Sequence, residues 1–217
     1  MDYTALYISL KLALVTTVIL VILGAPLAWF FAYRRFPGKP FVEALLYLPI
    51  ALPPTVIGFY LVMIMGPRGF LGSFWSSLTG SSLLFTFAGI AIAAILYSLP
   101  FAIQPMKAAF QKLDRRLVEN AAVLGLSPTA TFFRVVLPNS TSGIIAGAIL
   151  VFLHTIGAFG VILMVGGSIP GVTKVASIAI YEAVEMMDYR AAGMMALCFI
   201  PVSYLFLLLV NKLNEDG

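Results

Sequence analysis

The chain has 217 residues, of which 61% are hydrophobic and only 10% are charged. A soluble domain carries about 25% charged residues, so this composition excludes an ordinary soluble protein. We attribute the net charge of +4 to basic residues that face the anionic leaflet of a membrane, and not to nucleic-acid binding.

Five apolar stretches are long enough to cross a bilayer, which takes about 20 residues. They are Leu12–Tyr33, Ala44–Pro67, Leu83–Met106, Ser140–Val165 and Ala191–Asn211. Among Lys, Arg, His, Asp and Glu, these stretches contain only His154. The first stretch is too long for a signal peptide, whose apolar region has about 7–15 residues. We predict an all-α integral membrane protein with five transmembrane helices and one domain over residues 1–217.

Basic residues predict the orientation, because Lys and Arg gather on the cytoplasmic side of a membrane. Nine of the thirteen fall in the first loop, around the end of the third stretch and the loop after it, or behind the last stretch. The N-terminus is therefore expected outside, and the C-terminus in the cytoplasm, of a multi-pass protein of the plasma (inner) membrane.

The second stretch is interrupted by Pro49, Pro53 and Pro54. Each interior proline removes a backbone hydrogen bond, and a membrane tolerates the freed carbonyl only where protein or water satisfies it. The stretch is therefore either a pathway-lining segment or a kinked packing helix. Gly66–Ser82, which follows, is rich in Gly and Ser and is expected to be an outer loop.

The loop after the third stretch predicts two short helices. Helix-forming residues lead from Glu119 to Gly125, which tolerates the left-handed backbone that ends many helices. Ser127 then caps a second helix with Pro128 in its first turn, and this helix must stop by Pro138. Such a compact projection fits a groove on a soluble partner. We call this loop, about residues 112–138, the knob.

The fourth stretch carries Gly143 and Gly147, a spacing that lets two helices approach closely. It also carries His154, and an ionisable residue inside a span indicates a functional site by default. The alternative is a neutral imidazole hydrogen-bonded to a neighbouring helix. We favour that alternative, because the stretch contains no carboxylate partner.

The segment after the fourth stretch contains Thr173–Met187, which is amphipathic enough for a short helix in, or dipping into, the outer interface. Its charges argue against a sixth span, and they either dock an external protein or form a solvated face. These charges are Lys174, Glu182, Glu185 and Asp188.

The sequence contains no recognisable motif of an enzyme. It contains no phosphate-binding Gly-x-x-x-x-Gly-Lys-Ser/Thr loop, no metal-ligand spacing and no evident catalytic triad. Cys198 is the only cysteine, so no disulfide framework forms. We therefore predict neither an enzyme nor a cofactor or metal site in this chain.

The knob resembles the coupling loop of ATP-binding-cassette (ABC) importer permeases, which reads Glu-Ala-Ala, three residues, Gly, nine residues, then Ile-x-Leu-Pro. Two positions depart mildly, since Asn120 replaces an alanine and Val135 replaces the isoleucine. The residues that match in register are Glu119, Ala121, Gly125, Leu137 and Pro138. The resemblance implies the type I permease fold.

Within these permeases the chain looks most like the molybdate group, with tungstate and sulfate permeases next. The resemblance is carried by residues 36–62, 66–72 and 157–182 and by the knob. Members of this group commonly read Arg-x-x-x-Glu-Phe-Gly in the fourth span. This chain has His154 and Ala158 at the two charged positions, so both members of a one-turn charge pair have changed together.

The resemblance implies a permease subunit that imports molybdate or tungstate by alternating access. Its expected partners are a second copy of this chain, a cytoplasmic ATPase dimer that binds ATP and Mg²⁺, and an external oxyanion-binding protein. The expected docking residues are Glu119, Asn120, Ala121, Ala122, Leu124, Gly125, Leu137 and Pro138. The expected pathway residues are Pro53, Pro54, Thr55, Ser98, His154 and Thr155.

Other readings stay open at this point. A sulfate permease, or an ABC permease for another small solute such as an amino acid, would keep the same architecture. A channel or secondary transporter would work without an ATPase, and an intramembrane enzyme would depend on His154. Neither of the last two classes explains the spacing of the knob.

Overall fold

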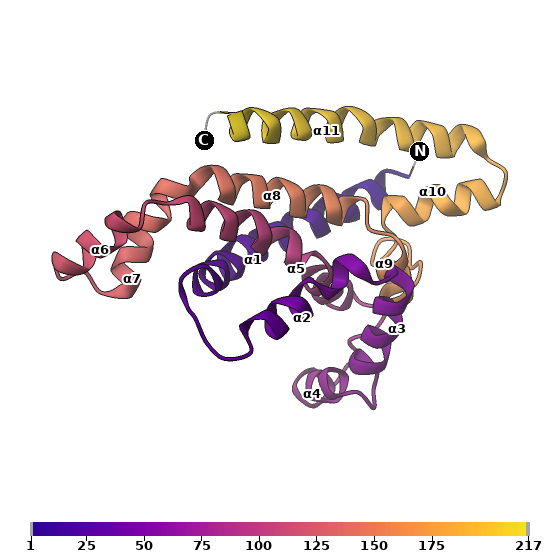
Figure 1. Ribbon diagram of the computed structural model, residues 1–217. Coiled ribbons are helices and arrows are strands. Elements are labelled where there is room, and N and C mark those ends of the chain that lie inside the picture. Colours follow the sequence, from indigo (N-terminus) through magenta and orange to yellow (C-terminus); the bar gives the residue numbers. More distant parts are fainter. Residues whose placement is uncertain (1, 216–217) are drawn as a thin grey trace.

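A computed structural model describes residues 2–215, and within this range all regular structure is helical (Figure 1). Three long helices form the centre: α1 (Tyr3–Tyr33), α5 (Phe87–Lys112) and α8 (Thr141–Ile156). Their shared core includes Leu20, Met106, Phe110 and Val151. The last helix, α11 (Tyr189–Glu215), packs on α8 and α10. The all-α prediction is confirmed.

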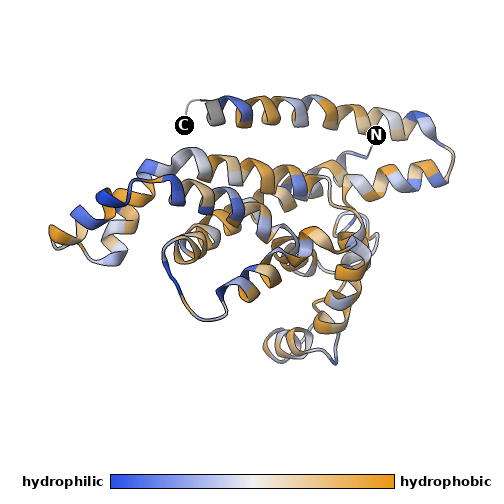
Figure 2. Cartoon of the chain, in the orientation of Figure 1, coloured by the Kyte–Doolittle hydropathy of each residue, from blue (hydrophilic) through white to orange (hydrophobic). Residues whose placement is uncertain are grey.

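Four helical segments are long and apolar enough to cross a bilayer, namely Tyr3–Tyr33, Phe87–Lys112, Pro138–Ile156 and Tyr189–Lys212. A bent pair, α2 (Lys39–Ala51) and α3 (Pro54–Met65), passes the same test when counted as one span. The five predicted stretches correspond to these five spans. Hydrophobic residues predominate along α3 and α11 (Figure 2), and many of them are exposed, such as Phe59 and Leu205, as a lipid-facing surface requires.

The prediction of one span over Ala44–Pro67 is wrong in shape, because α2 and α3 meet at 113°. Pro53 forces the residue before it, Leu52, into an extended conformation, with ψ of 143°. Pro54 then begins α3, where a proline needs no hydrogen-bond partner. Pro49, by contrast, is accommodated inside α2. The adjacent prolines therefore produce a sharp break where the sequence suggested kinks.

The prediction of one span over Ser140–Val165 is also wrong, because α8 ends at Ile156. The amide of Gly157 donates to the carbonyl of Leu153, and a new helix, α9 (Gly160–Gly166), follows. Helix α9 then packs against α3 and α5.

The other boundaries shift by a few residues. Thr86 caps α5, whose first residue is Phe87, and α5 runs on past Met106 to Lys112. The outer loop Gly66–Ser82 contains a helix, α4 (Phe70–Thr79). The short helix predicted over Thr173–Met187 is α10 (Ala176–Glu185), which buries Ile178 and packs on α11.

Two glycines set the distance between α5 and α8. A Cβ atom on Gly143 would lie 2.2 Å from the Cβ of Ala109 and 3.0 Å from the carbonyl oxygen of Pro105. A Cβ atom on Gly147 would lie 3.1 Å from the carbonyl oxygen of Ala102. The predicted close approach is therefore present, and it lies between two helices of one chain.

Helix α2 is tied to the centre by charged side chains, besides the packing of Leu46 against the core. Every side chain of α2 is exposed or half-buried. Glu43 Oε1 lies 2.6 Å from Lys107 Nζ on α5 and 3.8 Å from Lys39 Nζ. Lys39 also donates to the carbonyl oxygens of Phe31 (2.5 Å) and Arg34 (3.0 Å) at the end of α1. Lys39 thus fixes the α1–α2 turn.

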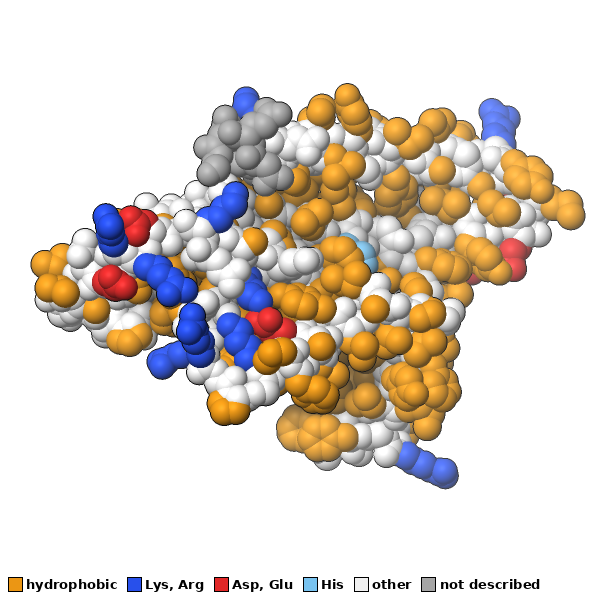
Figure 3. Space-filling model, viewed as in Figure 1, with side chains coloured by type: hydrophobic (Ala, Val, Ile, Leu, Met, Phe, Trp, Pro, Cys, Tyr) orange, Lys and Arg blue, Asp and Glu red, His pale blue; other side chains and the backbone are white. Residues whose placement is uncertain are grey.

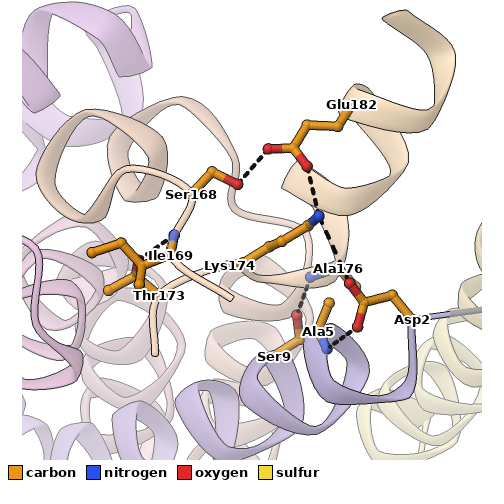
Figure 4. Close-up of polar contacts among 9 residues, drawn as sticks. All are labelled: Asp2, Ala5, Ser9, Ser168, Ile169, Thr173, Lys174, Ala176 and Glu182. Carbon is orange, nitrogen blue, oxygen red and sulfur yellow. Dashed lines mark hydrogen bonds and ion pairs between the residues drawn. The ribbon is translucent and has the colours of Figure 1, made fainter. Parts of the chain in front are cut away.

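A polar network ties the start of α1 to the segment before α10 (Figure 4). Lys174 Nζ lies 2.6 Å from Glu182 Oε2 and 3.8 Å from Asp2 Oδ2. The hydrogen bond from Lys174, together with one from Ser168, lowers the pKa of Glu182 below its ordinary value. Ser9 Oγ accepts from the backbone of Ala176 at 2.7 Å. Lys174 and Glu182 are therefore engaged within the chain, and do not form a simple solvated face.

Candidate functional site

The knob begins with α6 (Arg115–Val123), which ends as the sequence predicts. Gly125 has a φ of +78°, and its amide donates to the carbonyl of Ala122 at 3.0 Å. The amide of Leu126 donates to the carbonyl of Ala121, also at 3.0 Å. This pair of hydrogen bonds is the Schellman arrangement, which satisfies the last carbonyls of a helix. Only a residue that tolerates positive φ fits at its centre.

The second helix of the knob, α7 (Pro128–Thr131), starts at Ser127, whose Oγ accepts from the amide of Ala130 at 3.2 Å. It continues into a π-helical turn over Phe132–Val136 and a 3₁₀ turn over Pro138–Ser140 that leads into α8. The cap and the end before Pro138 are confirmed. The π turn has no signal in the sequence that we recognised.

The tip of the knob presents apolar side chains to the exterior. Val123 is 85% exposed and Leu124 is 79% exposed, and Glu119, Asn120 and Ala122 are exposed beside them. Ala121 is only 4% exposed, so it packs inward and lies on the opposite side from the tip. The burial of Ala121 does not fit the expectation that it is a docking residue. Val123, which was not among the expected docking residues, belongs to the exposed surface of the tip.

The base of the knob is anchored in the core. Phe132 is buried, with its ring centroid 5.1 Å from that of Trp29 on α1 and 6.3 Å from that of Phe110 on α5. Leu137 is half-buried against the same core, whereas Pro138 is exposed. Leu137 therefore contributes to anchoring. Phe132 was missed because an apolar residue at a helix end has no distinctive sequence signal.

Three of the predicted pathway residues meet where α5 and α8 pack. Ser98 Oγ lies 2.9 Å from His154 Nδ1 and 3.1 Å from Thr155 Oγ1. The imidazole stacks on Phe101, with a centroid distance of 4.0 Å. Ser98 and Thr155 are buried, while His154 is half-buried and reaches a hollowed part of the surface, pale blue in Figure 3. One polar group thus opens to the exterior inside a span.

The other predicted pathway residues lie at a different junction. Pro53 precedes α3, and Pro54 and Thr55 form its first turn. Gly160, at the start of α9, lies close enough that a Cβ there would approach Pro54 Cβ to 3.3 Å. Thr55 is exposed. The structure therefore gives two groups of candidate pathway residues, one on α5 and α8 and one where α3 meets α9.

Ala158 occupies the position where similar permeases commonly carry an acid. It is 6% exposed and packs in an apolar cluster with Ile162 and Ile178. A carboxylate there would be a buried charge without the arginine that His154 replaces. The two changes are therefore physically consistent. Among the side chains of residues 2–212, no group of three His, Cys, Asp or Glu is placed to hold a metal ion.

A family model described as "Binding-protein-dependent transport system inner membrane component" matches residues 7–215. The chain belongs to this family. It is a membrane permease component of an ABC importer, and the resemblance seen in the knob is confirmed at the level of the family.

Relatives within the family include two kinds of oxyanion permease. The permease is 44% identical to the molybdenum transport system permease protein ModB of Azotobacter vinelandii, over 95% of this chain and 91% of that protein. It is 32% identical to the sulfate transport system permease protein CysT of Escherichia coli K12, over 96% and 75%. It is 31% identical to ModB of the same organism, over 93% and 88%.

Solved structures agree on the fold. One match is a chain of a bacterial ABC transporter that imports alginate. Its TM-score is 0.72 and its identity 17%, and the match covers 99% of this chain and 78% of that one. A second match is a chain of the MetNI methionine ABC transporter in an inward-facing conformation. Its TM-score is 0.73 and its identity 14%, and the match covers 100% of this chain and 95% of that one. The type I permease fold is therefore shown.

Proposed function

We propose that this permease imports a tetrahedral oxyanion, with molybdate or tungstate as the first choice and sulfate as the second. The observation that carries the proposal is the 44% identity, over 95% of the chain, to a molybdenum permease. The sulfate permeases CysT are 32–34% identical and a second molybdenum permease is 31% identical, so the order of choice rests on the Azotobacter relative alone. The working unit is a homodimer with two cytoplasmic ATPase subunits and an external oxyanion-binding protein, and ATP and Mg²⁺ bind the ATPase.

The exposed tip of the knob is the proposed contact with the ATPase. Val123 and Leu124 supply apolar surface, and Glu119 and Asn120 supply polar groups beside it. When the ATPase dimer closes on ATP, each knob moves with its subunit and the spans tilt toward the outward-open state. Arg115, Arg116 and Arg134 add contacts that weaken as salt rises.

The proposed orientation puts the knob in the cytoplasm, the N-terminus outside and the C-terminus inside. Basic side chains gather around the α1–α2 turn and α6, on the same side as the knob (Figure 3). Lys and Arg concentrate in cytoplasmic loops, so this distribution supports the orientation.

The proposed pathway includes Ser98, His154 and Thr155, with Pro53, Pro54 and Thr55 lining it near α3. If the Ser98 hydroxyl donates to Nδ1 of the imidazole, the proton of His154 is on Nε2, and Nε2–H is free to donate to a passing oxyanion. A neutral donor suits a transporter, because a weak site releases its cargo.

His154→Leu is expected to raise the KM for molybdate uptake about tenfold, the effect of losing one hydrogen bond of roughly 1.4 kcal/mol. His154→Gln is the matched control, since its amide still donates a proton, and it should retain most of the uptake. Both variants are compared in vesicles at equal protein level and equal thermal stability. An unchanged KM in His154→Leu removes this residue from the pathway.

The cargo is tested by ATP-driven uptake of labelled molybdate in vesicles that carry this permease, its ATPase and its binding protein. We expect strong competition by tungstate and weak competition by sulfate. Strong competition by sulfate moves the assignment to the sulfate group. Uptake that persists without ATP and disappears with an ionophore indicates a secondary transporter. Uptake of an amino acid, with no oxyanion uptake, overturns the substrate class.

A further inference from the structure

A cavity of about 630 Å³ lies between the end of α1 and the knob. Its walls combine the aromatic side chains Trp29, Phe30 and Phe36 with Arg34 and Arg35, and the start of α7 closes it. An adjoining cavity of about 410 Å³ shares Tyr33, Arg35 and Val118 with the first one and adds Arg115. The proposed coupling mechanism uses Arg115 and Glu119 of the smaller cavity, but it makes no use of the larger one.

The charges around these cavities favour an anion. Arg34, Arg35 and Arg115 are exposed, and none of the three forms an ion pair with the side chains that the structure describes, those of residues 2–212. Lys39 also lines the smaller cavity, but it is engaged with two carbonyl oxygens and Glu43. Among the described lining residues, Glu119 is the only carboxylate. The two cavities together are therefore lined by three guanidinium groups without an ion pair and by one carboxylate.

The larger cavity continues onto the lipid-facing side of α1. Phe30, in its wall, is 44% exposed, and Leu23 is 60% exposed. The two residues are seven apart in one helix, so they lie on the same face of α1. Arg34 and Arg35 directly follow the last turn of this span, at the depth of lipid headgroups. An anionic group bound at the arginines therefore has an apolar surface directly beside it.

We propose that this cavity binds the headgroup of an anionic phospholipid from the inner leaflet. The phosphate lies between Arg34 and Arg35, whose planar guanidinium groups match phosphate oxygens in pairs. Arg115 adds charge from the knob side, and an acyl chain runs along Phe30 and Leu23. The lipid thus touches both the end of the first span and the knob. The proposal is independent of which solute the permease carries.

The test uses the full permease purified from membranes that contain phosphatidylglycerol and phosphatidylcholine, with bound lipids counted by native mass spectrometry. The wild-type chain should retain phosphatidylglycerol in preference to phosphatidylcholine. Arg34→Gln with Arg35→Gln should reduce this retention by about fivefold for each arginine removed. The matched control removes two basic residues elsewhere, by Arg68→Gln with Arg190→Gln, and should retain lipid as the wild type does.

Two further measurements distinguish a lipid from other occupants of the cavity. Excess inorganic phosphate should leave phosphatidylglycerol bound, because the headgroup is held by its acyl chain as well. Complete displacement by phosphate shows a free-anion site and overturns the proposal. Equal retention in the double variant and the wild type also overturns it. If the double variant loses the ATPase during purification while lipid retention is unchanged, the cavity is a protein contact and the proposal fails.

Discussion

Gly125→Pro is expected to abolish ATP-driven uptake while membrane insertion stays normal. Proline fixes φ near −65°, whereas Gly125 has a φ of +78°. Proline also removes the amide that donates to the carbonyl of Ala122. The end of α6 must then rearrange, and Val123 and Leu124 lose the position in which they are exposed at the tip of the knob. Uptake in reconstituted vesicles and co-purification of the ATPase measure the effect.

Gly125→Asn is the matched control for this change. No atom lies within 4 Å of the Cβ that a side chain would add at Gly125, so only the backbone conformation opposes a substitution. Asparagine adopts positive φ more readily than other side chains and should keep most of the uptake. Normal uptake by Gly125→Pro, or equal loss in both variants, contradicts the proposed role of the glycine turn.

The second large effect is expected at Gly143, where even alanine does not fit. Its added methyl group would lie 2.2 Å from the Cβ of Ala109, so α8 must move away from α5. Overpacking of this kind costs roughly 1–3 kcal/mol of stability. We expect Gly143→Ala to lower the thermal midpoint of the purified permease and to reduce its amount in the membrane.

Gly193→Ala, on α11, is the control with the same chemistry. No atom lies within 4 Å of the added Cβ, and alanine is favoured over glycine in a helix by about 1 kcal/mol. This variant should be as stable as the wild type or more stable. If Gly143→Ala is equally stable, α5 and α8 do not pack as closely as the structure shows.

Local signals in the sequence were sufficient for the knob. Gly125 and Ser127 act within a few residues of their own positions, through a left-handed turn and a side-chain cap, and both were predicted. The number and approximate positions of the apolar spans follow from composition and length, but the breaks within the second and fourth stretches do not. The family follows from the spacing Glu119 to Pro138, while the docking roles of these residues remain predictions.

Features that depend on distant residues were predicted less well. The predicted hydrogen bond from His154 to a neighbouring helix is confirmed, but its partner Ser98 lies 56 residues away and was not foreseen as that partner. The inward direction of Ala121 depends on packing within the knob, which a matching motif does not reveal. The break at Gly157 was missed, because the apolar residues on both sides of it read as one continuous stretch.

The helical turns after Ser127 make the knob and α8 a single mechanical lever. The π turn at Phe132–Val136 and the 3₁₀ turn at Pro138–Ser140 join α7 to α8 without an extended residue between them. His154 lies sixteen residues beyond Pro138, about 24 Å along a helix that rises 1.5 Å per residue. A tilt of about 10° at the base of α8 therefore displaces His154 by roughly 4 Å. A small rotation at the knob end of α8 becomes a shift larger than a water molecule at His154.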